Sequence, residues 1–487
     1  MRRYWQLLTR AAWIVTTAAA GLLLSATSHA KGPLDAHIEK GRQLFEREFL
    51  TGQGAEPGSD GLGPMFNHVS CAACHKQGGI GGGGPVDVNA EMISAVMPLG
   101  TVSKSKKGNG SDHLAPLRAI HPAFVDESGG LKPNLVLHRF SSDHRYDVLR
   151  EQLTGKKVPY MPSDAERQSL QRELARRPLA DAKVSPGFKL LLSQRNTPAL
   201  FGSGVIDAIS DETLLELAAS QQKDSVISGR VSPIENRRAG RFGWRGQTEH
   251  LRDFVLGACA NELGLEVPGV SQPVVPQQPD YKAVALDLTV QQCNQLVAFV
   301  ASLPPPKIAW PDEESKRLLV IEGQKLFKQV GCILCHVEDV GPAQSIYSDL
   351  LLHDMGPGMG DPVLAMPPPG QVSSVQPAPP GIPGQSRGGY SGGFVASGLV
   401  SKRQTNGMEL SRKLDPLPED LSQEWRTPPL WGMSDSAPYL HDGRAETVLE
   451  AVVWHGGEAR KSAEAFFALP APERIKVLEF LACLKAP

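Results

Sequence analysis

The chain has few aromatic residues, a net charge near zero and, beyond its first 30 residues, no long apolar run. Aromatic residues make up 6% of the 487 residues, whereas glycine and proline number 49 and 40, a composition that predicts long irregular connections. The formal net charge of −2 does not indicate a nucleic-acid partner. No later segment is long and apolar enough to span a bilayer, so we expect no stable transmembrane span in the mature chain.

Acidic residues are absent from residues 1–30, which contain three arginines, an apolar stretch and a terminal Ser28-His29-Ala30. A positive start, an apolar centre and a small-x-small ending predict a cleaved signal peptide and a periplasmic protein, with an uncleaved anchor as the alternative. Cleavage removes three positive charges, so the formal net charge changes from −2 to −5.

Cysteine is scarce, yet four of the seven cysteines stand in two C-x-x-C-H runs. The runs comprise Cys71, Cys74 and His75, and Cys332, Cys335 and His336. This is the attachment signature of haem c: the thiols add to the vinyl groups, and the histidine binds the iron. A disulfide or a redox C-x-x-C is the rival, whereas a zinc site would need a second ligand pair that neither run has nearby. We predict two covalently bound haem c groups, which are normally attached outside the cytoplasmic membrane.

Three cysteines remain: Cys259, Cys293 and Cys483. In an oxidising compartment Cys259 and Cys293 could form a disulfide, and one thiol must stay unpaired. The alternative is that all three remain thiols.

An internal repeat predicts the architecture. Gly41 and Phe45 precede the first haem motif as Gly323 and Phe327 precede the second, each pair on one helix face, where the glycine lets another helix approach. Further repeats follow, in residues 195–202 and 426–432, and in residues 212–216 and 446–450. Each half then closes with an amphipathic helix.

The fold class is therefore expected to be mainly α. We predict two cytochrome c-like haem domains from an internal duplication, with long irregular insertions. The first spans residues 31–306 and carries an insertion between Gly78 and Arg195, and the second spans residues 307–487. Residues 356–393, rich in proline and glycine, are predicted to form an exposed loop.

Several motifs make the chain resemble the di-haem oxidoreductase family, whose members are labelled predicted thiol oxidoreductases or peroxidases. They are residues 66–75, Arg241-Phe242-Gly243-Trp244, residues 424–432, residues 438–444 and residues 455–459. The chain is more distantly similar to bacterial di-haem cytochrome c peroxidases. The resemblance implies two facing cytochrome c domains, in which one haem handles substrate and the other passes electrons. We also expect Ca²⁺ as an additional cofactor, without assigning residues to it.

For the second haem, the relatives place the distal ligand shortly after the P-Y-x-H-D-G run, where His455 lies. Our hypothesis is that His336 and His455 bind this iron from opposite sides, with Met355 or Met359 as rivals. His441 is expected to hydrogen-bond Asp442 in a turn, and Arg444 could pair with a haem propionate.

For the first haem, the position equivalent to His455 falls near Gln221, which offers no strong ligand. The iron is either open or capped from the insertion, and the candidates are Met97, His113, His121, His138 and His144. An acid/base group near an open iron would assist peroxide cleavage. Asp207, Asp211 and Glu212 are the candidates, although an acid in a first helical turn is more often a cap. We expect Trp244, Trp425 and Trp431 to be core residues.

The leading functional prediction is a periplasmic di-haem oxidoreductase that exchanges electrons with a small cytochrome or cupredoxin and acts on peroxide or a small substrate at the first haem. The alternative is a non-enzymatic di-haem electron carrier, because residues 206–210 lack the acid/amide pair of the peroxidases. Thiol oxidation ranks last, since its candidate, Cys483, lies on an apolar helix.

Overall fold

The computed structural model describes residues 33–96, 114–126, 129–132, 134–154, 181–182, 189–224, 227–232, 239–361 and 423–487. The predicted signal peptide (1–30) and most of the predicted loop (356–393) lie outside these residues. The helices are α2 (Pro33–Glu46), α3 (Cys71–Cys74), α4 (Ala115–Ile120), α5 (His144–Thr154), α7 (Ser203–Asp207), α8 (Asp211–Asp224), α9 (Leu251–Leu263), α10 (Val290–Ser302), α11 (Glu314–Gln329), α12 (Val448–Val453), α13 (Arg460–Ala468) and α14 (Ala471–Ala482). None of the helices in the described residues is long and apolar enough to cross a membrane.

The strands are short and pair antiparallel. They are β1 (Met65–Phe66), β2 (Ala90–Val96), β3 (Asn134–Val136), β4 (Phe140–Ser141), β5 (Asp181–Ala182), β6 (Lys189–Arg195), β7 (Leu352–Asp354) and β8 (Glu424–Arg426). The largest sheet has the order β3-β2-β6-β5, and β1-β4 and β7-β8 form two-stranded sheets. Helices therefore dominate, as predicted.

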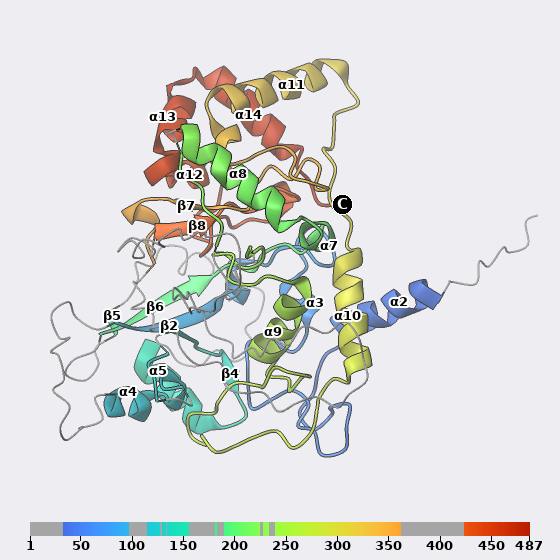
Figure 1. The fold of residues 1–487 in the computed structure, drawn as a ribbon, viewed down its shortest axis with the longest axis vertical. Helices are drawn as coiled ribbons and strands as arrows, with labels where there is room; N and C mark the ends of the chain where they lie inside the picture. Colours follow the sequence, from blue (N-terminus) through green and yellow to red (C-terminus); the bar gives the residue numbers. More distant parts are fainter. Residues whose placement is uncertain are drawn as a thin grey trace, which may run out of the picture.

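The insertion after Gly78 is more regular than the sequence predicts. It supplies β2 to β6, and a core that includes Ile93, Phe124 and Tyr146 packs beside the sheet (Figure 1). The prediction of an irregular insertion is wrong for these described residues. Ile93 and Ala95 of β2 and Leu190 of β6 belong to this core. Neither strand has the strict alternation of apolar and polar residues that would have predicted it from the sequence.

The two predicted glycine contacts bring pairs of helices together. A methyl group on Gly41 of α2 would lie 1.9 Å from the carbonyl oxygen of Gln295 in α10. A methyl group on Gly323 of α11 would lie at the same distance, 1.9 Å, from the carbonyl oxygen of Lys476 in α14. Only a residue without a side chain lets the backbones approach this closely.

The phenylalanine one turn after each glycine packs at the same crossing. Phe45 lies 5.3 Å from Phe299 of α10 between ring centroids, and Phe327 lies 5.5 Å from Phe480 of α14. Each also faces the histidine of the following C-x-x-C-H run, Phe45 at 6.1 Å from His75 and Phe327 at 6.3 Å from His336. The helix pairs α2–α10 and α11–α14 therefore support the two motifs in the same way.

Helix α8 belongs to the first half of the sequence but reaches the second. Figure 1 shows it, in green, among the orange and red elements of the C-terminal part. The amide nitrogen of Gln221, Nε2, donates to Asp349 at 2.8 Å and to the carbonyl oxygen of Leu334 at 3.3 Å. The position equivalent to His455 thus contacts the second haem motif, which explains why it does not supply a ligand to the first.

Candidate functional site

The two C-x-x-C-H runs share one local geometry. In the first, α3 is capped by Ser70, and the backbone N–H of His75 donates to the carbonyl of Cys71 at 3.0 Å. In the second, a 3₁₀ turn spans Cys332–Leu334, and the N–H of His336 donates to the carbonyl of Cys332, also at 3.0 Å. One helical turn therefore separates each first cysteine from its histidine.

Both motif histidines keep one ring nitrogen available for a metal. Nδ1 of His75 lies 3.1 Å from the carbonyl oxygen of Pro198 and 3.2 Å from that of Gly82. Nδ1 of His336 lies 2.8 Å from the carbonyl oxygen of Tyr347. A carbonyl accepts only from a protonated nitrogen, so the proton sits on Nδ1 and the lone pair on Nε2. Burial lowers the pKa of each histidine to about 4, which favours the neutral, ligating form.

The motif thiols do not suit thiol–disulfide chemistry. Burial raises the pKa of Cys71, Cys74 and Cys332 to about 12, and it also raises the pKa of Cys335. A redox C-x-x-C needs the opposite, a thiolate stabilised near neutral pH. The raised pKa values of these four thiols therefore do not favour the redox alternative.

The remaining cysteines are thiols in the structure. Cys259 and Cys293 are both buried in the core between α9 and α10, without a disulfide between them. The predicted bridge is therefore not formed. Cys483 is buried, and burial raises its pKa, so it lacks the exposure that a reactive thiol requires.

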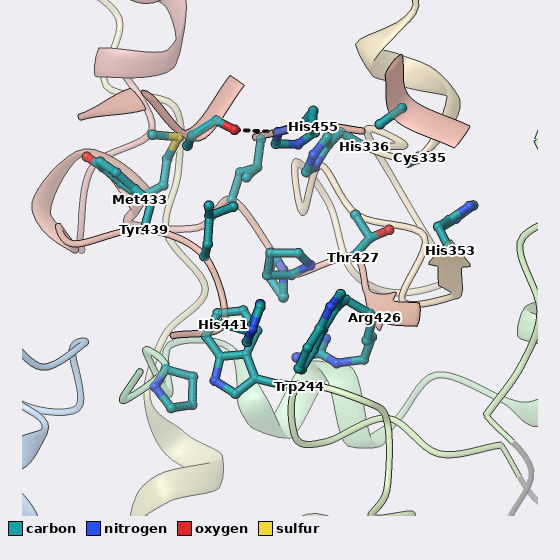
Figure 2. A pocket seen from close by; sticks show the side chains of 18 of the residues that line it. Trp244, Cys335, His336, His353, Arg426, Thr427, Met433, Tyr439, His441 and His455 are labelled. Atoms are coloured by element: carbon teal, nitrogen blue, oxygen red, sulfur yellow. Dashed lines mark hydrogen bonds between the residues drawn. The ribbon is translucent and has the colours of Figure 1, made fainter. Parts of the chain in front are cut away.

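His336 faces His455, as predicted from the sequence. Their ring centroids are 6.4 Å apart, and Figure 2 shows the two rings side by side at one end of a cavity of about 270 Å³. Two imidazoles on opposite sides of one metal, with metal–nitrogen bonds of about 2 Å, have centroids about 6 Å apart. Nδ1 of His455 lies 2.7 Å from the carbonyl oxygen of Ala451, so its Nε2 also carries the lone pair. This arrangement fits a haem iron between the two rings.

The sequence around His455 explains its position. Thr447 and Glu450 form a capping box that starts α12, and the helix ends just before His455. Gly456 and Gly457 then let the chain pack on the end of β7: a methyl on Gly457 would lie 2.1 Å from the carbonyl oxygen of Asp354. A larger residue there would push His455 away from His336.

The rival methionines are close to the same cavity. Met355 and Met359 both line it. Met359 is buried, and its carbonyl oxygen accepts a hydrogen bond from the indole N–H of Trp425 at 2.9 Å. Of these three candidates, His455 is the one whose separation from His336, 6.4 Å between ring centroids, matches two ligands on one metal.

His353 was not identified from the sequence. It is fully buried between two carboxylates, with Nε2 at 2.8 Å from Asp349 and Nδ1 at 2.7 Å from Glu458. Burial by itself lowers the pKa of His353, but hydrogen bonds to Asp349, Cys335 and Glu458 outweigh it and raise the pKa to about 12. The ring is therefore an imidazolium ion at neutral pH, beside the second haem motif.

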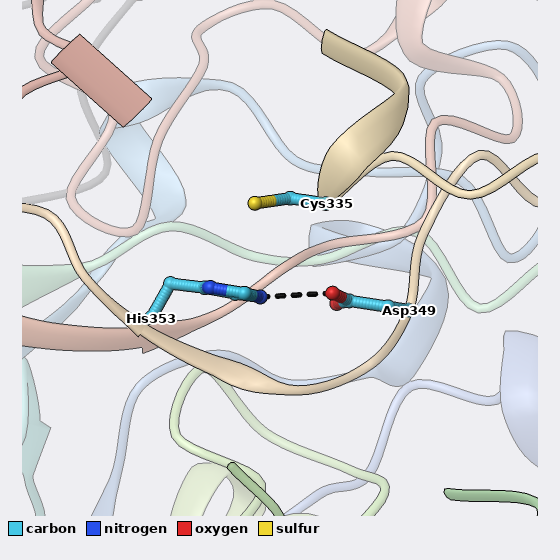
Figure 3. Close-up of side chains that lie close together, drawn as sticks. All are labelled: Cys335, Asp349 and His353. Carbon is cyan, nitrogen blue, oxygen red and sulfur yellow. Dashed lines mark hydrogen bonds and ion pairs between the residues drawn. The ribbon is translucent and has the colours of Figure 1, made fainter. Parts of the chain in front are cut away.

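Cys335, Asp349 and His353 are the single group of three potential metal ligands found among the described residues (Figure 3). Sulfur and imidazole donors suit zinc or copper and do not suit Ca²⁺, which takes oxygen ligands. Since both nitrogens of His353 are already bound to carboxylates, we assign the group to charge pairing. The expected Ca²⁺ stays a prediction.

The hydrogen bond expected between His441 and Asp442 is not formed, and Arg444 has partners within the protein. Nε2 of His441 lies 3.9 Å from Asp442, beyond hydrogen-bond distance, and the ring instead stacks on Trp425 with centroids 3.5 Å apart. Arg444 is bound to Asp442 at 2.7 Å and to the carbonyl oxygen of Gly358 at 2.6 Å. It is therefore engaged by the protein, and the prediction that it pairs with a propionate is not supported.

The three candidate acids have structural contacts. Asp207 accepts from the backbone N–H of Leu251 at 2.9 Å, at the start of α9. Asp211 forms an ion pair with Arg241, and Glu212 is an exposed residue in the first turn of α8. None of the three lines the cavity. These contacts agree with the reading that acids in a first turn act as caps.

The candidates for a distal ligand of the first haem lie in or near the insertion. Met97 and His113 are outside the described residues, and so is the side chain of His144. His121 and His138 are buried, and each has one ring nitrogen without a hydrogen-bond partner, Nε2 and Nδ1 respectively. Burial lowers their pKa values to about 3 and about 4, so both are neutral. They remain candidates.

The predicted core tryptophans are only partly core residues. Trp431 is buried in the core of the first half, and Trp425 is buried in the wall of the cavity. Trp244 is half-buried, lines the cavity and donates to the carbonyl oxygen of Asn196 at 2.8 Å.

Comparison with known proteins gives a family and a few distant relatives. A family described as "Di-haem oxidoreductase, putative peroxidase" matches residues 13–105 and 414–484, which contain the first haem motif and His455. The gamma subunit of hydrazine synthase from Kuenenia stuttgartiensis is 28% identical over 132 residues, which are 27% of this chain and 31% of that protein. The match thus spans less than a third of the length of this curated relative.

Among solved structures, hydrazine synthase from Kuenenia stuttgartiensis aligns with 60% of this chain and 73% of its own, at 17% identity and a TM-score of 0.29. A MauG-like protein associated with microbial copper homeostasis aligns with 57% of this chain and 90% of its own, at 14% identity and a TM-score of 0.26. The family resemblance predicted from the sequence is confirmed: in both matched stretches this chain matches the di-haem oxidoreductases.

Proposed function

We propose that this protein is an exported di-haem c-type oxidoreductase in which the second haem relays electrons and the first meets a small oxidant such as peroxide. The observation that carries the proposal is the shared geometry of the two motifs. Each histidine donates Nδ1–H to a carbonyl, presents Nε2, and lies one helical turn after the first cysteine of its run. The family match agrees with a di-haem redox role.

Each haem would be held by its own set of residues. Cys71, Cys74 and His75 would hold the first, and Cys332, Cys335, His336 and His455 would hold the second. Haem iron supplies one-electron transfer and, where a coordination position is open, oxidant binding. The chain supplies neutral imidazoles, an apolar cavity wall and the fixed imidazolium of His353.

The difference between the two sites supports the division of labour. His455 faces His336, which would fill both axial positions of the second iron and leave it suited to electron transfer. In the first half, the position equivalent to His455 falls near Gln221 of α8, and Gln221 is hydrogen-bonded to Asp349 of the second half. Helix α8 therefore supplies no counterpart of His455 to the first iron. An open or exchangeable position at the first iron is part of the proposal.

The domain organisation and location belong to the same proposal. We infer two haem domains, residues 31–306 and 307–487, derived by duplication, because α2–α10 and α11–α14 cross at equivalent glycines. We also infer cleavage of residues 1–30, residence in the periplasm, and a small cytochrome or cupredoxin as the electron-transfer partner.

EPR spectroscopy of the purified protein, fully ferric and then half-reduced, tests the proposal. We expect one low-spin signal from the second haem, together with a high-spin signal that is present or appears after one electron and disappears with stoichiometric peroxide. Two low-spin signals that ignore peroxide in both states would make the protein a non-enzymatic electron carrier.

The axial ligand is tested by His455→Ala, with Met355→Leu as the matched control. Loss of the low-spin signal of the second haem in His455→Ala, but not in Met355→Leu, is the expected result. If the second haem stays six-coordinate and low-spin in His455→Ala, the assignment of His455 is wrong.

A further inference from the structure

The cavity that contains His336 and His455 has a polar end formed by Arg426 and His441. Figure 2 shows these two side chains at the opposite end of the drawn pocket from Cys335, His336 and His455. Most of the wall between the two ends is apolar and includes Phe201, Leu430 and Trp431. The cavity therefore has the shape of a site for an amphipathic ligand, apolar along its length and charged at one edge.

Arg426 has a buried guanidinium group with unused hydrogen-bonding capacity. Its side chain is 7% exposed, its Nε donates to the carbonyl oxygen of Gly243 at 2.7 Å, and its Nη1 has no hydrogen-bond partner. Burial lowers the pKa of Arg426 to about 10, with the charge of Asp349 acting in the opposite direction. Arg426 is still charged at neutral pH, and a buried charge with a free N–H group is costly unless an anion binds there.

His441 adds a second unused group at the same end. It is 1% exposed, and neither of its ring nitrogens has a hydrogen-bond partner. The nearest carboxylate oxygens, on Asp361 and Asp442, are 3.8 and 3.9 Å from Nε2. Stacking on Trp425 fixes the orientation of the ring, so its nitrogens are held in place before any ligand binds.

The surroundings of this end are positively charged. Arg195 and Arg245 both lie over the Trp425 ring, with guanidinium carbons 5.3 and 4.4 Å from its centroid, and both pair with Asp361. After burial, the charges of Arg195, Arg444 and Arg245 are the causes that hold the pKa of His441 well below its usual value. A carboxylate placed here meets a positive potential and hydrogen-bond donors.

We propose that Arg426 and His441 bind the propionate carboxylates of the second haem. The inference rests on the proposed function, because it requires a haem attached at Cys332 and Cys335. Attachment through the vinyl side of the porphyrin leaves its propionate side directed away from the motif. Nη1 of Arg426 and the ring nitrogens of His441 are nitrogen atoms without a hydrogen-bond partner at the end of the drawn pocket opposite Cys335. This assignment replaces Arg444, which is bound to Asp442.

The test compares Arg426→Gln with Arg444→Gln in the haem-loaded protein. Removing a positive charge that pairs with a propionate stabilises the ferric state. We therefore expect the midpoint potential of the second haem to shift to lower values in Arg426→Gln, and to shift much less in Arg444→Gln, which lies outside the cavity wall and is already paired with Asp442. In Arg426→Gln the pH range over which this potential varies should also move upward, since the unpaired propionate titrates at higher pH.

His441→Phe keeps the ring stacked on Trp425 and removes only the nitrogens, so it separates hydrogen bonding from packing. Resonance Raman spectra should show a shifted propionate bending band in Arg426→Gln and His441→Phe, and an unchanged band in Arg444→Gln. Equal potentials and bands in all three variants would overturn the inference.

Three further outcomes separate this inference from its alternatives and from the proposed function. If acetate or benzoate binds the haem-loaded protein and Arg426→Gln abolishes that binding, the polar end takes an external carboxylate and the propionate assignment is wrong. If the protein carries only one covalent haem in a pyridine haemochrome assay, the proposed function fails first. If the protein carries two haems with a low-spin second site, but Arg426→Gln changes neither the midpoint potential nor the propionate band, this inference is refuted and the proposed function stands.

Discussion

Replacing Gly323 with alanine should destabilise the second haem site selectively. Gly323 lies where α11 crosses α14, and the added methyl group would stand 1.9 Å from the carbonyl oxygen of Lys476. Ordinary contact begins at 3.4 Å, so the two helices must separate by about 1.5 Å, since 3.4 − 1.9 = 1.5. Backbone cannot rotate aside as a flexible side chain can, so the whole helix has to move.

The size of the effect follows from packing and helix propensity. Overpacking a tight contact costs about 1–3 kcal/mol, whereas alanine in place of glycine in a helix gains up to about 1 kcal/mol. Gly257 of α9 provides the matched control, because a methyl group there meets no atom within 4 Å. We expect Gly323→Ala to lower the free energy of unfolding and Gly257→Ala to leave it unchanged or raise it.

Chemical denaturation of the haem-loaded protein measures the stability, and EPR reports on each haem. Phe327, one turn after Gly323, contacts His336, so movement of α11 should alter the signal of the second haem. Gly41→Ala should alter that of the first through Phe45. If Gly323→Ala is as stable as wild type with an unchanged second signal, the close crossing of α11 and α14 does not support the site.

Three other predictions concern charge, capping and thiols. The pKa of His353 is raised from 6.5 to about 12. Its contribution to the free energy of unfolding is therefore complete below pH 6.5 and is lost as the pH rises towards 12, by up to about 1.4 kcal/mol per pH unit. When the free energy of unfolding is measured by denaturation between pH 7 and 10, it should change less with pH in His353→Gln than in the wild type. Thr447→Ala removes the cap of α12 and should cost about 1 kcal/mol, measured by denaturant titration, with an unchanged midpoint arguing against the cap. Thiol titration of the denatured protein should count three reactive cysteines, because the proposed haem attachment would convert four of the seven into thioethers; one would indicate a disulfide, and seven would exclude covalent haem.

The parts of the site that could be predicted are those encoded by local spacing or repetition. The C-x-x-C-H runs fix both cysteines and the histidine within one turn. The glycine–phenylalanine pairs repeat before each run, and the contacts of Gly41 and Gly323 are those the pattern predicts. His455 was identified from the resemblance to the di-haem peroxidases, in which the distal ligand follows the P-Y-x-H-D-G run, and its ring does face His336.

The parts that could not be predicted depend on contacts between distant segments. His353 gains its charge from Asp349 and Glu458, and Glu458 is 105 residues further along the chain. From the sequence, Arg444 was the arginine assigned to a propionate, and the structure shows that Asp442 already binds it. The repeat aligns Thr197 with Thr427, so Arg426 stands opposite Asn196 and the repeat itself does not draw attention to it.

The second haem site is built by both halves of the chain, and this bears on how the halves function together. Gln221 of α8 binds Asp349, Ser228 binds Glu458 at 2.5 Å, and both carboxylates hold His353. Residues of the first half thereby fix a charge beside the second motif. The charge on His353 therefore depends on contacts that cross from the first half to the second, and Gln221→Ala should perturb the second haem site although the substitution lies in the first half.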